Sequence, residues 1–110
     1  MCMVSLLDLD DVVDGIENAW SPVDVAHVND QVVRAALFMG EYHWHKHELE
    51  DELFLVYSGS IRIHVRGEDD IQLSKGQLCV IPKGVEHKPE ASEPSIVLLF
   101  EPFVLKSKGD

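Results

Sequence analysis

The chain has 110 residues, of which 45% are hydrophobic, so it is long enough to form one domain with a core of its own. Nine Lys and Arg against twenty Asp and Glu give a formal net charge of −11, which excludes the basic surface that nucleic acids and anionic membranes require. No run approaches the roughly 18 apolar residues of a membrane span, and the acidic N-terminus makes a poor signal peptide, so we expect a cytoplasmic protein.

The two cysteines do not indicate a disulfide framework. Cys2 stands at a terminus that we expect to fray. Cys79 lies inside the apolar run Leu78-Cys79-Val80-Ile81, which favours a buried and unreactive thiol.

Residues 8–18 predict one short helix near the N-terminus. Four apolar side chains in this stretch fall at helical spacing, namely Leu9, Val12, Val13 and Ile16. Asp8 is a suitable N-cap, whereas Gly15 weakens the helix. Residues 20–22, Trp-Ser-Pro, read as a connector that ends the helical part of the chain.

From residue 23 onward the apolar pattern has a period of two, which is typical of β-strands. The runs with this pattern are 23–27, 31–38, 41–47, 52–57, 60–66, 71–73, 77–81, 85–88 and 96–100. Ser58-Gly59 has the form of a two-residue hairpin, and residues 89–95 read as a polar loop. Val104 and Leu105 could add an edge. About nine short strands separated by turns predict an all-β sandwich or barrel.

The residues with the clearest chemistry are two histidines in Trp44-His45-Lys46-His47. In a strand, alternate side chains share a face, so His45 and His47 should project side by side. A turn at 48–51 would bring Glu52 in on the next strand, on the same face as Phe54. A carboxylate buried there is costly unless a cation accompanies it.

His87, in Pro82-Lys83-Gly84-Val85-Glu86-His87, is the fourth candidate, provided that the fold returns it to the first three. Imidazole and carboxylate groups together suit borderline transition metals. The sequence therefore predicts a metal site made of His45, His47, Glu52 and His87. His43 shares the parity of His45, so we expect it to line the pocket or to support a ligand, and an ordinary core histidine is the alternative.

The remaining histidines and aromatic residues have structural interpretations. His27 and His64 read as exposed strand histidines, and Trp44 alternates away from the ligand face toward the N-terminal segment or a partner subunit. Four further aromatic residues are core candidates first and pocket walls second: Phe38, Tyr42, Phe54 and Phe100.

Both histidine-bearing stretches resemble the two conserved motifs of the cupin superfamily. The first motif is matched by Gly40, His45, His47, Glu52 and Gly59, with a leading spacer one residue shorter than the family's. The second is matched by Gly76, Pro82, Gly84 and His87, with Ala91 where the family has Asn. The local pattern is most similar to the small single-domain cupins, some of which carry a mannose-6-phosphate isomerase-like label that does not establish the reaction.

The resemblance implies a cupin jelly-roll β-barrel (a double-stranded β-helix) with one short N-terminal helix. We accordingly divide a single domain into the helix and connector (1–22), the cupin barrel (23–105) and a flexible tail (106–110). The resemblance also implies a homodimer. Three apolar or aromatic side chains face outward on their strand and would need to be covered by a second chain or by the helix, namely Leu53, Leu55 and Tyr57.

Three imidazoles and one carboxylate on a six-coordinate ion leave two positions for water or substrate. The ion would be Fe, Mn, Ni or Zn. Such a site suits an oxygenase or isomerase acting on a small polar metabolite. A non-catalytic binding or sensor cupin and a domain that the metal merely stabilises remain alternatives. The sequence assigns no separate catalytic residue and contains no nucleotide or phosphate-binding motif.

Overall fold

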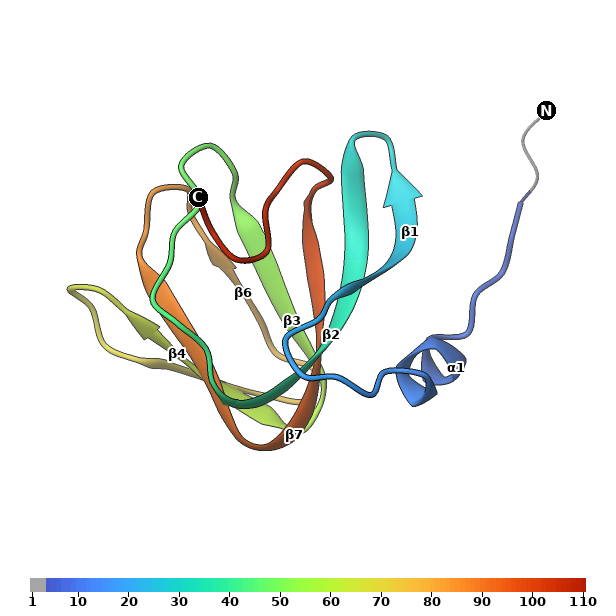
Figure 1. Ribbon diagram of the computed structural model, residues 1–110, viewed down its shortest axis with the longest axis horizontal. Coiled ribbons are helices and arrows are strands. Elements are labelled where there is room, and N and C mark those ends of the chain that lie inside the picture. Colours follow the sequence, from blue (N-terminus) through green and yellow to red (C-terminus); the bar gives the residue numbers. More distant parts are fainter. Residues whose placement is uncertain (1–3) are drawn as a thin grey trace.

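The computed structural model describes residues 4–110, which form one short helix and seven strands (Figure 1). The helix α1 spans Leu9–Asp14. The strands are β1 (Val23–Val28), β2 (Gln31–Glu41), β3 (Glu52–Ser58), β4 (Ser60–Val65), β5 (Ile71–Ser74), β6 (Leu78–Ile81) and β7 (His87–Pro102). Cys2, which we expected to fray, lies outside the described residues. Within residues 4–110, no helix has the length and apolar character needed to cross a membrane.

The 16-residue strand β7 joins the two sides of the molecule. Its later part lies between β2 and β3 in the order β1-β2-β7-β3-β6. Its first part, from His87 to Glu90, pairs with β4, which in turn pairs with β5, and Glu90 also pairs with Glu41 at the end of β2. The strands therefore curl around a common interior (Figure 1), and the prediction of an all-β jelly-roll barrel with one short helix is confirmed.

The helix is shorter than the predicted 8–18. The Asp8 side chain caps it by accepting a hydrogen bond from the Asp10 amide at 3.0 Å, and it ends at Gly15. None of the six residues of α1, all of them in the described chain, is buried. Figure 1 shows α1 to one side of the barrel.

The predicted strand at 41–47 is wrong beyond Glu41. At Gly40 the backbone takes a φ of 79°, and the pairing of β2 with β7 shifts register between Phe38 and Gly40. The chain then runs beside the start of β7, where its one β-bridge joins His45 to His87. Pro89, which accepts a hydrogen bond from the Tyr42 amide, has no N–H to return, so a regular ladder cannot form there.

Two other predictions are corrected by strand pairing. Residues 89–95 are not a loop, because His87–Pro102 is one strand in which Pro89 and Ala91 face inward while Lys88 and Glu90 face outward. The hairpin at Ser58-Gly59 is also wrong. β3 pairs with β6 and β7, whereas β4 pairs with β5 and β7, so this dipeptide is a corner between sheets.

The core lies between the sheets and is built from inward positions of alternating strands. Its buried members include Ala36, Phe38, Phe54, Val56, Ile61, Ile63, Val97 and Leu99. Burial of one such large side chain contributes about 1.5–3 kcal/mol. Cys79 packs against this cluster in a half-buried position, and burial raises the pKa of its thiol, which agrees with an unreactive role.

Residues 106–110, expected to be loose, lie against the segment that carries the histidines. The Asp110 amide donates to the Lys46 carbonyl at 3.0 Å, and a ring nitrogen of His43 lies 2.9 Å from the Lys108 carbonyl. Gly109 has a φ of 92°, and a Cβ there would come within 2.7 Å of the His45 Cβ. Figure 1 shows the end of this dark red segment beside the green one. Backbone groups take part in these contacts, so the pattern of side chains in the sequence did not predict them.

The corner at Gly59 gives a test of the fold. Gly59 and Gly67 have similar φ values of 84° and 81°, but a Cβ at Gly59 would lie 2.3 Å from Ser95 Oγ, while one at Gly67 would meet nothing within 4 Å. Gly59→Ala should therefore lower the free energy of unfolding by about 1–3 kcal/mol more than Gly67→Ala does. Urea denaturation of both variants measures the difference, and equal losses would contradict the close packing of Ser95.

Candidate metal centre

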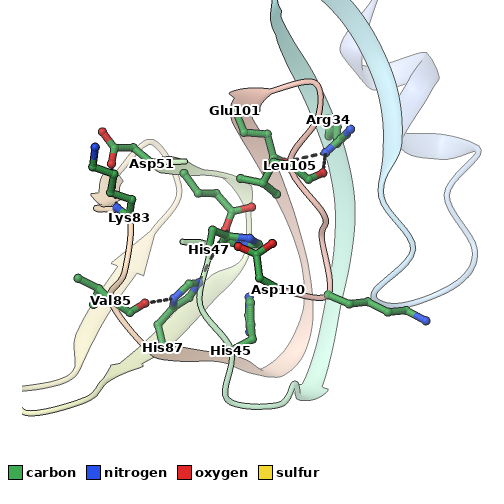
Figure 2. A network of polar contacts seen from close by, with 12 residues as sticks. Arg34, His45, His47, Asp51, Lys83, Val85, His87, Glu101, Leu105 and Asp110 are labelled. Carbon is green, nitrogen blue, oxygen red and sulfur yellow. Dashed lines mark hydrogen bonds and ion pairs between the residues drawn. The ribbon is translucent and has the colours of Figure 1, made fainter. Parts of the chain in front are cut away.

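The structure brings the four predicted site residues together. His45 and His47 come from the segment after β2, Glu52 is the first residue of β3, and His87 is the first residue of β7. Each offers one potential ligand atom, and these atoms all lie within 4.8 Å of one another. Glu52 Oε1 is 3.4 Å from His47 Nε2 and 3.7 Å from His87 Nε2. Figure 2 shows the three imidazoles gathered beside Asp110.

Two of the imidazoles are oriented by backbone carbonyls two residues earlier in the chain. His45 Nδ1 lies 2.9 Å from the His43 carbonyl, and His87 Nδ1 lies 2.9 Å from the Val85 carbonyl (Figure 2). Because a carbonyl can only accept, each Nδ1 must carry the proton. Each Nε2 is then left with its lone pair free, which is the arrangement that metal-binding histidines show.

Several polar atoms of the cluster are buried without a hydrogen-bond partner in the described chain. They are both ring nitrogens of His47 and Nε2 of His87. Such atoms are costly to leave unpaired. Ligand atoms held at about 2.0–2.2 Å from one ion stand roughly 3–4 Å apart, which matches the separations from Glu52. The donor set therefore fits a divalent transition metal, and a cation would satisfy Nε2 of His87 and one ring nitrogen of His47.

The protonation of the cluster also suits a cation. Burial lowers the pKa of His45 to about 4, so this imidazole is neutral at pH 7. Burial alone would raise the pKa of Glu52, but the neighbouring His47 and His87 outweigh it and lower the pKa, which keeps the carboxylate charged. His45 thus presents a neutral nitrogen donor and Glu52 an anionic oxygen donor.

A second buried carboxyl, Glu101 on β7, lies behind Glu52. Its side chain is fully buried, and neither oxygen has a hydrogen-bond partner in the described chain. Burial and the negative charge of Glu52 raise its pKa, so Glu101 retains its proton while Glu52 is ionised. Arg34 Nη1 lies 3.6 Å from Glu101 Oε1.

Arg34 also anchors the chain that follows β7. Its guanidinium donates to Asp24 Oδ1 at 2.9 Å, to the Leu105 carbonyl at 3.1 Å and to the Phe103 carbonyl at 2.9 Å. Figure 2 shows Arg34, Glu101 and Leu105 together on one side of the histidines. This clamp sets the direction in which residues 106–110 leave β7.

Sequence reasoning missed Arg34 and Glu101, although strand parity could have found them. Arg34 alternates with the buried Val32 and Ala36, and Glu101 alternates with the buried Leu99. An Arg and a Glu at inward positions of two apolar strands indicate polar side chains that meet in the interior.

A pocket opens beside His45 and Glu52, with about 360 Å³ of empty space that includes the part open to solvent. Its lining is mainly apolar and comprises Trp20, Pro22, Ala36, Phe38, Tyr42, Phe54, Pro89, Leu99 and Ser107 in addition to the two site residues. Phe38, Tyr42 and Phe54 thus form pocket walls, whereas Phe100 faces outward and is 42% exposed.

The other residues singled out in the sequence lie outside the cluster. His43 is exposed and supports His45 through its backbone carbonyl, because the strand that would have turned its ring inward is broken. His64 is an outer-face histidine between Asp70 and Glu90, as its structural interpretation requires, and His27 is exposed. Trp44 also faces outward, where the Arg66 guanidinium lies 4.1 Å from its ring centroid.

Comparison with known proteins gives one family and several relatives. The family described as "Cupin domain" matches residues 39–101. The uncharacterized protein YdbB of Bacillus subtilis is 36% identical over 77 residues, which are 70% of this chain and 68% of YdbB. A Caenorhabditis briggsae protein named "Probable inactive acireductone dioxygenase 2" is 31% identical over 90 residues, covering 78% of this chain and 57% of that protein.

Among solved structures, a cupin-2 domain containing protein from Shewanella frigidimarina superposes with a TM-score of 0.85. It is 37% identical, and the match covers 88% of this chain and 94% of that one. The likeness therefore extends well beyond the residues of the candidate site.

Replacement of Glu101 tests the buried carboxyl. Because the fold raises its pKa above the ordinary 4.5, the folded state retains a proton that the unfolded state loses, and stability falls as the pH rises above about 4.5. Glu101→Gln cannot ionise and should stabilise the metal-free protein by about 1–3 kcal/mol at pH 8 and much less at pH 5. Denaturant unfolding at the two pH values measures this, and an equal effect at both would show that Glu101 is ionised in the fold.

Proposed function

The chain belongs to the Cupin domain family, and on that premise we propose that it is a metal-dependent enzyme that acts on a small molecule in the pocket beside the histidine cluster. One divalent transition-metal ion, Fe, Mn, Ni or Zn, is held in the barrel. The proposed ligands are His45, His47, Glu52 and His87. The observation that carries the proposal is the set of buried imidazole nitrogens that lack a partner in residues 4–110.

When bound, the ion would supply a Lewis acid or an oxygen-activating centre with positions left for a substrate. The chain's own residues prepare the site. The carbonyls of His43 and Val85 hold the two Nδ1 protons, which directs both Nε2 atoms toward Glu52. Apolar walls such as Phe54 limit the water that reaches the reacting atoms.

The open pocket separates this proposal from a purely structural metal site. A structural site is closed, whereas here two of the proposed ligands, His45 and Glu52, line a space that is continuous with solvent. An oxygenase is favoured over an isomerase of sugar phosphates. None of the described residues lining the pocket is Lys or Arg, which a phosphate would require.

The second candidate is a cupin that binds a small molecule at the metal without turnover. Its support is that, apart from the proposed ligands, only Tyr42 and Ser107 among the described lining residues carry a proton to exchange. The C. briggsae relative, named as a probable inactive dioxygenase, is consistent with this reading. Oxygen consumption by iron-loaded protein during a metabolite screen separates the two candidates, since only the enzyme consumes it.

We also propose a homodimer formed through the outer face of β3, β6 and β7. Leu53 pairs with Val80 and Phe100, and Leu55 pairs with Leu78, so apolar side chains lie side by side across three strands. Leu78, Val80 and Phe100 are 57%, 49% and 42% exposed. Because α1 buries none of its residues, the described chain leaves this face open, and a second copy could cover it.

Metal analysis tests the proposed ligands. Purified and reloaded protein should contain about one divalent ion per chain, and His87→Ala should weaken metal binding by about 100-fold or more, because loss of a ligand costs at least as much as loss of its support. His64→Ala, which removes an outer-face histidine, should leave the metal content unchanged. Unchanged metal in His87→Ala, or none in the reloaded wild type, would contradict the site.

Light scattering tests the dimer. The wild type should have twice the 12.4 kDa of one chain. Phe100→Glu places a charge within the proposed face and should give monomers, whereas Val104→Glu, at a position that is 74% exposed outside that face, should remain dimeric. A monomeric wild type at micromolar concentration would refute the interface.

A further inference from the structure

The pocket beside the histidine cluster concentrates aromatic side chains. Half of the chain's phenylalanine, tyrosine and tryptophan residues line it. They come from separate parts of the chain, namely Trp20 from the connector before β1, Phe38 from β2, Tyr42 from the segment after β2 and Phe54 from β3. Their convergence on one space beside His45 suits a ligand that contacts aromatic rings.

The rings form a continuous wall that reaches the metal site. The centroid of Trp20 lies 4.4 Å from that of Phe38 and 4.7 Å from that of Tyr42, with interplanar angles of 34° and 26°. Tyr42 is in turn perpendicular to His45 at 5.3 Å. These rings pack on one another, and the parts of them that line the pocket are surfaces on which a further aromatic ring packs well.

Trp20 is held in place by its backbone and by its indole N–H. Its φ of 60° is unfavourable for a residue with a side chain, and such strain persists only where the surroundings impose it. The backbone N–H donates to the Leu37 carbonyl at 2.8 Å, and the indole N–H donates to the Met39 carbonyl at 3.0 Å. Because the polar atom of the ring already has its partner, the ring offers the pocket its apolar surface.

The charges of the pocket narrow the ligand further. In the described chain, its ionisable lining groups are Tyr42, His45 and Glu52, and no Lys or Arg lines it, so a phosphate or a second anionic group would be unpaired. The pocket is partly open to solvent, so a ring need not be enclosed on every side.

We propose that this pocket binds a planar, single-ring aromatic molecule that carries an oxygen donor for the metal. This inference rests on the proposed metal site and deepens it, and it replaces the expectation of a small polar metabolite. The ring packs against Trp20 and Tyr42, and its oxygen substituent points past His45 toward the ion.

Matched hydroxamic acids test the proposal, because they share one metal-binding group and differ in the ring. In Co²⁺-loaded protein, titration followed by the visible cobalt bands should show benzohydroxamic acid binding at least tenfold more tightly than cyclohexanecarbohydroxamic acid. Trp20→Ala should remove this preference, and Trp20→Phe should retain most of it. Acetohydroxamic acid, which has no ring, should bind the wild type and Trp20→Ala equally, with the same metal content. Equal affinity for the two ring compounds in the wild type, or a preference that survives in Trp20→Ala, overturns the proposal.

A measurement without metal distinguishes failure of the pocket from failure of the metal site. Trp20 and Trp44 are the two tryptophans, so Trp44→Phe leaves Trp20 as the source of the single indole N–H signal in the NMR spectrum. In metal-free protein, phenol should shift this signal more than cyclohexanol at equal concentration. Such a shift supports the aromatic pocket even if no metal binds, whereas equal shifts overturn it even if metal analysis succeeds.

Discussion

The constraint on which the structure depends is the burial of polar donors inside an apolar barrel. His47, His87 and Glu52 are nearly inaccessible to water, and the two Nε2 atoms have no partner among the described residues. Burial of this kind is unfavourable unless something in the interior compensates for the lost hydration. The backbone compensates for one nitrogen of His87 and one of His45, and a bound cation would compensate for the other nitrogen of each and for one nitrogen of His47. The same buried groups that are costly without a cation therefore make the site selective for one.

A second layer of charge surrounds this cluster. Glu52 and Glu101 are neighbouring carboxyls of opposite protonation, and Arg34 lies on the far side of Glu101. The arrangement keeps one negative charge at the metal site, because the neutral Glu101 adds none. Arg34 also donates to the Phe103 and Leu105 carbonyls. The same side chain therefore contacts Glu101 and the segment that follows β7. The interior electrostatics and the path of the C-terminal residues are thereby coupled.

The local sequence pattern was sufficient to predict much of the fold and the four residues that cluster at the site. The alternation around Glu52 and Phe54 predicted which face is buried, and motif spacing predicted that His87 returns to His45 and His47. The errors arose where the secondary structure of a segment depends on which strands it pairs with, because the local sequence pattern does not encode strand pairing. Ser58-Gly59 has the composition of a hairpin but connects strands that pair elsewhere, and Pro89 interrupts a ladder beside His45. Trp20 could not have been assigned to the pocket, since only tertiary contacts place it there.

Trp20, Phe38 and Ser107 line the pocket yet lie outside residues 39–101, the stretch that matches the family. The four proposed metal ligands all lie within that stretch. Part of the proposed pocket wall therefore comes from segments that flank the family match, while Tyr42, Phe54 and the proposed ligands lie within it. A lineage could change those flanking segments and reshape the pocket while the residues that identify the family stayed the same.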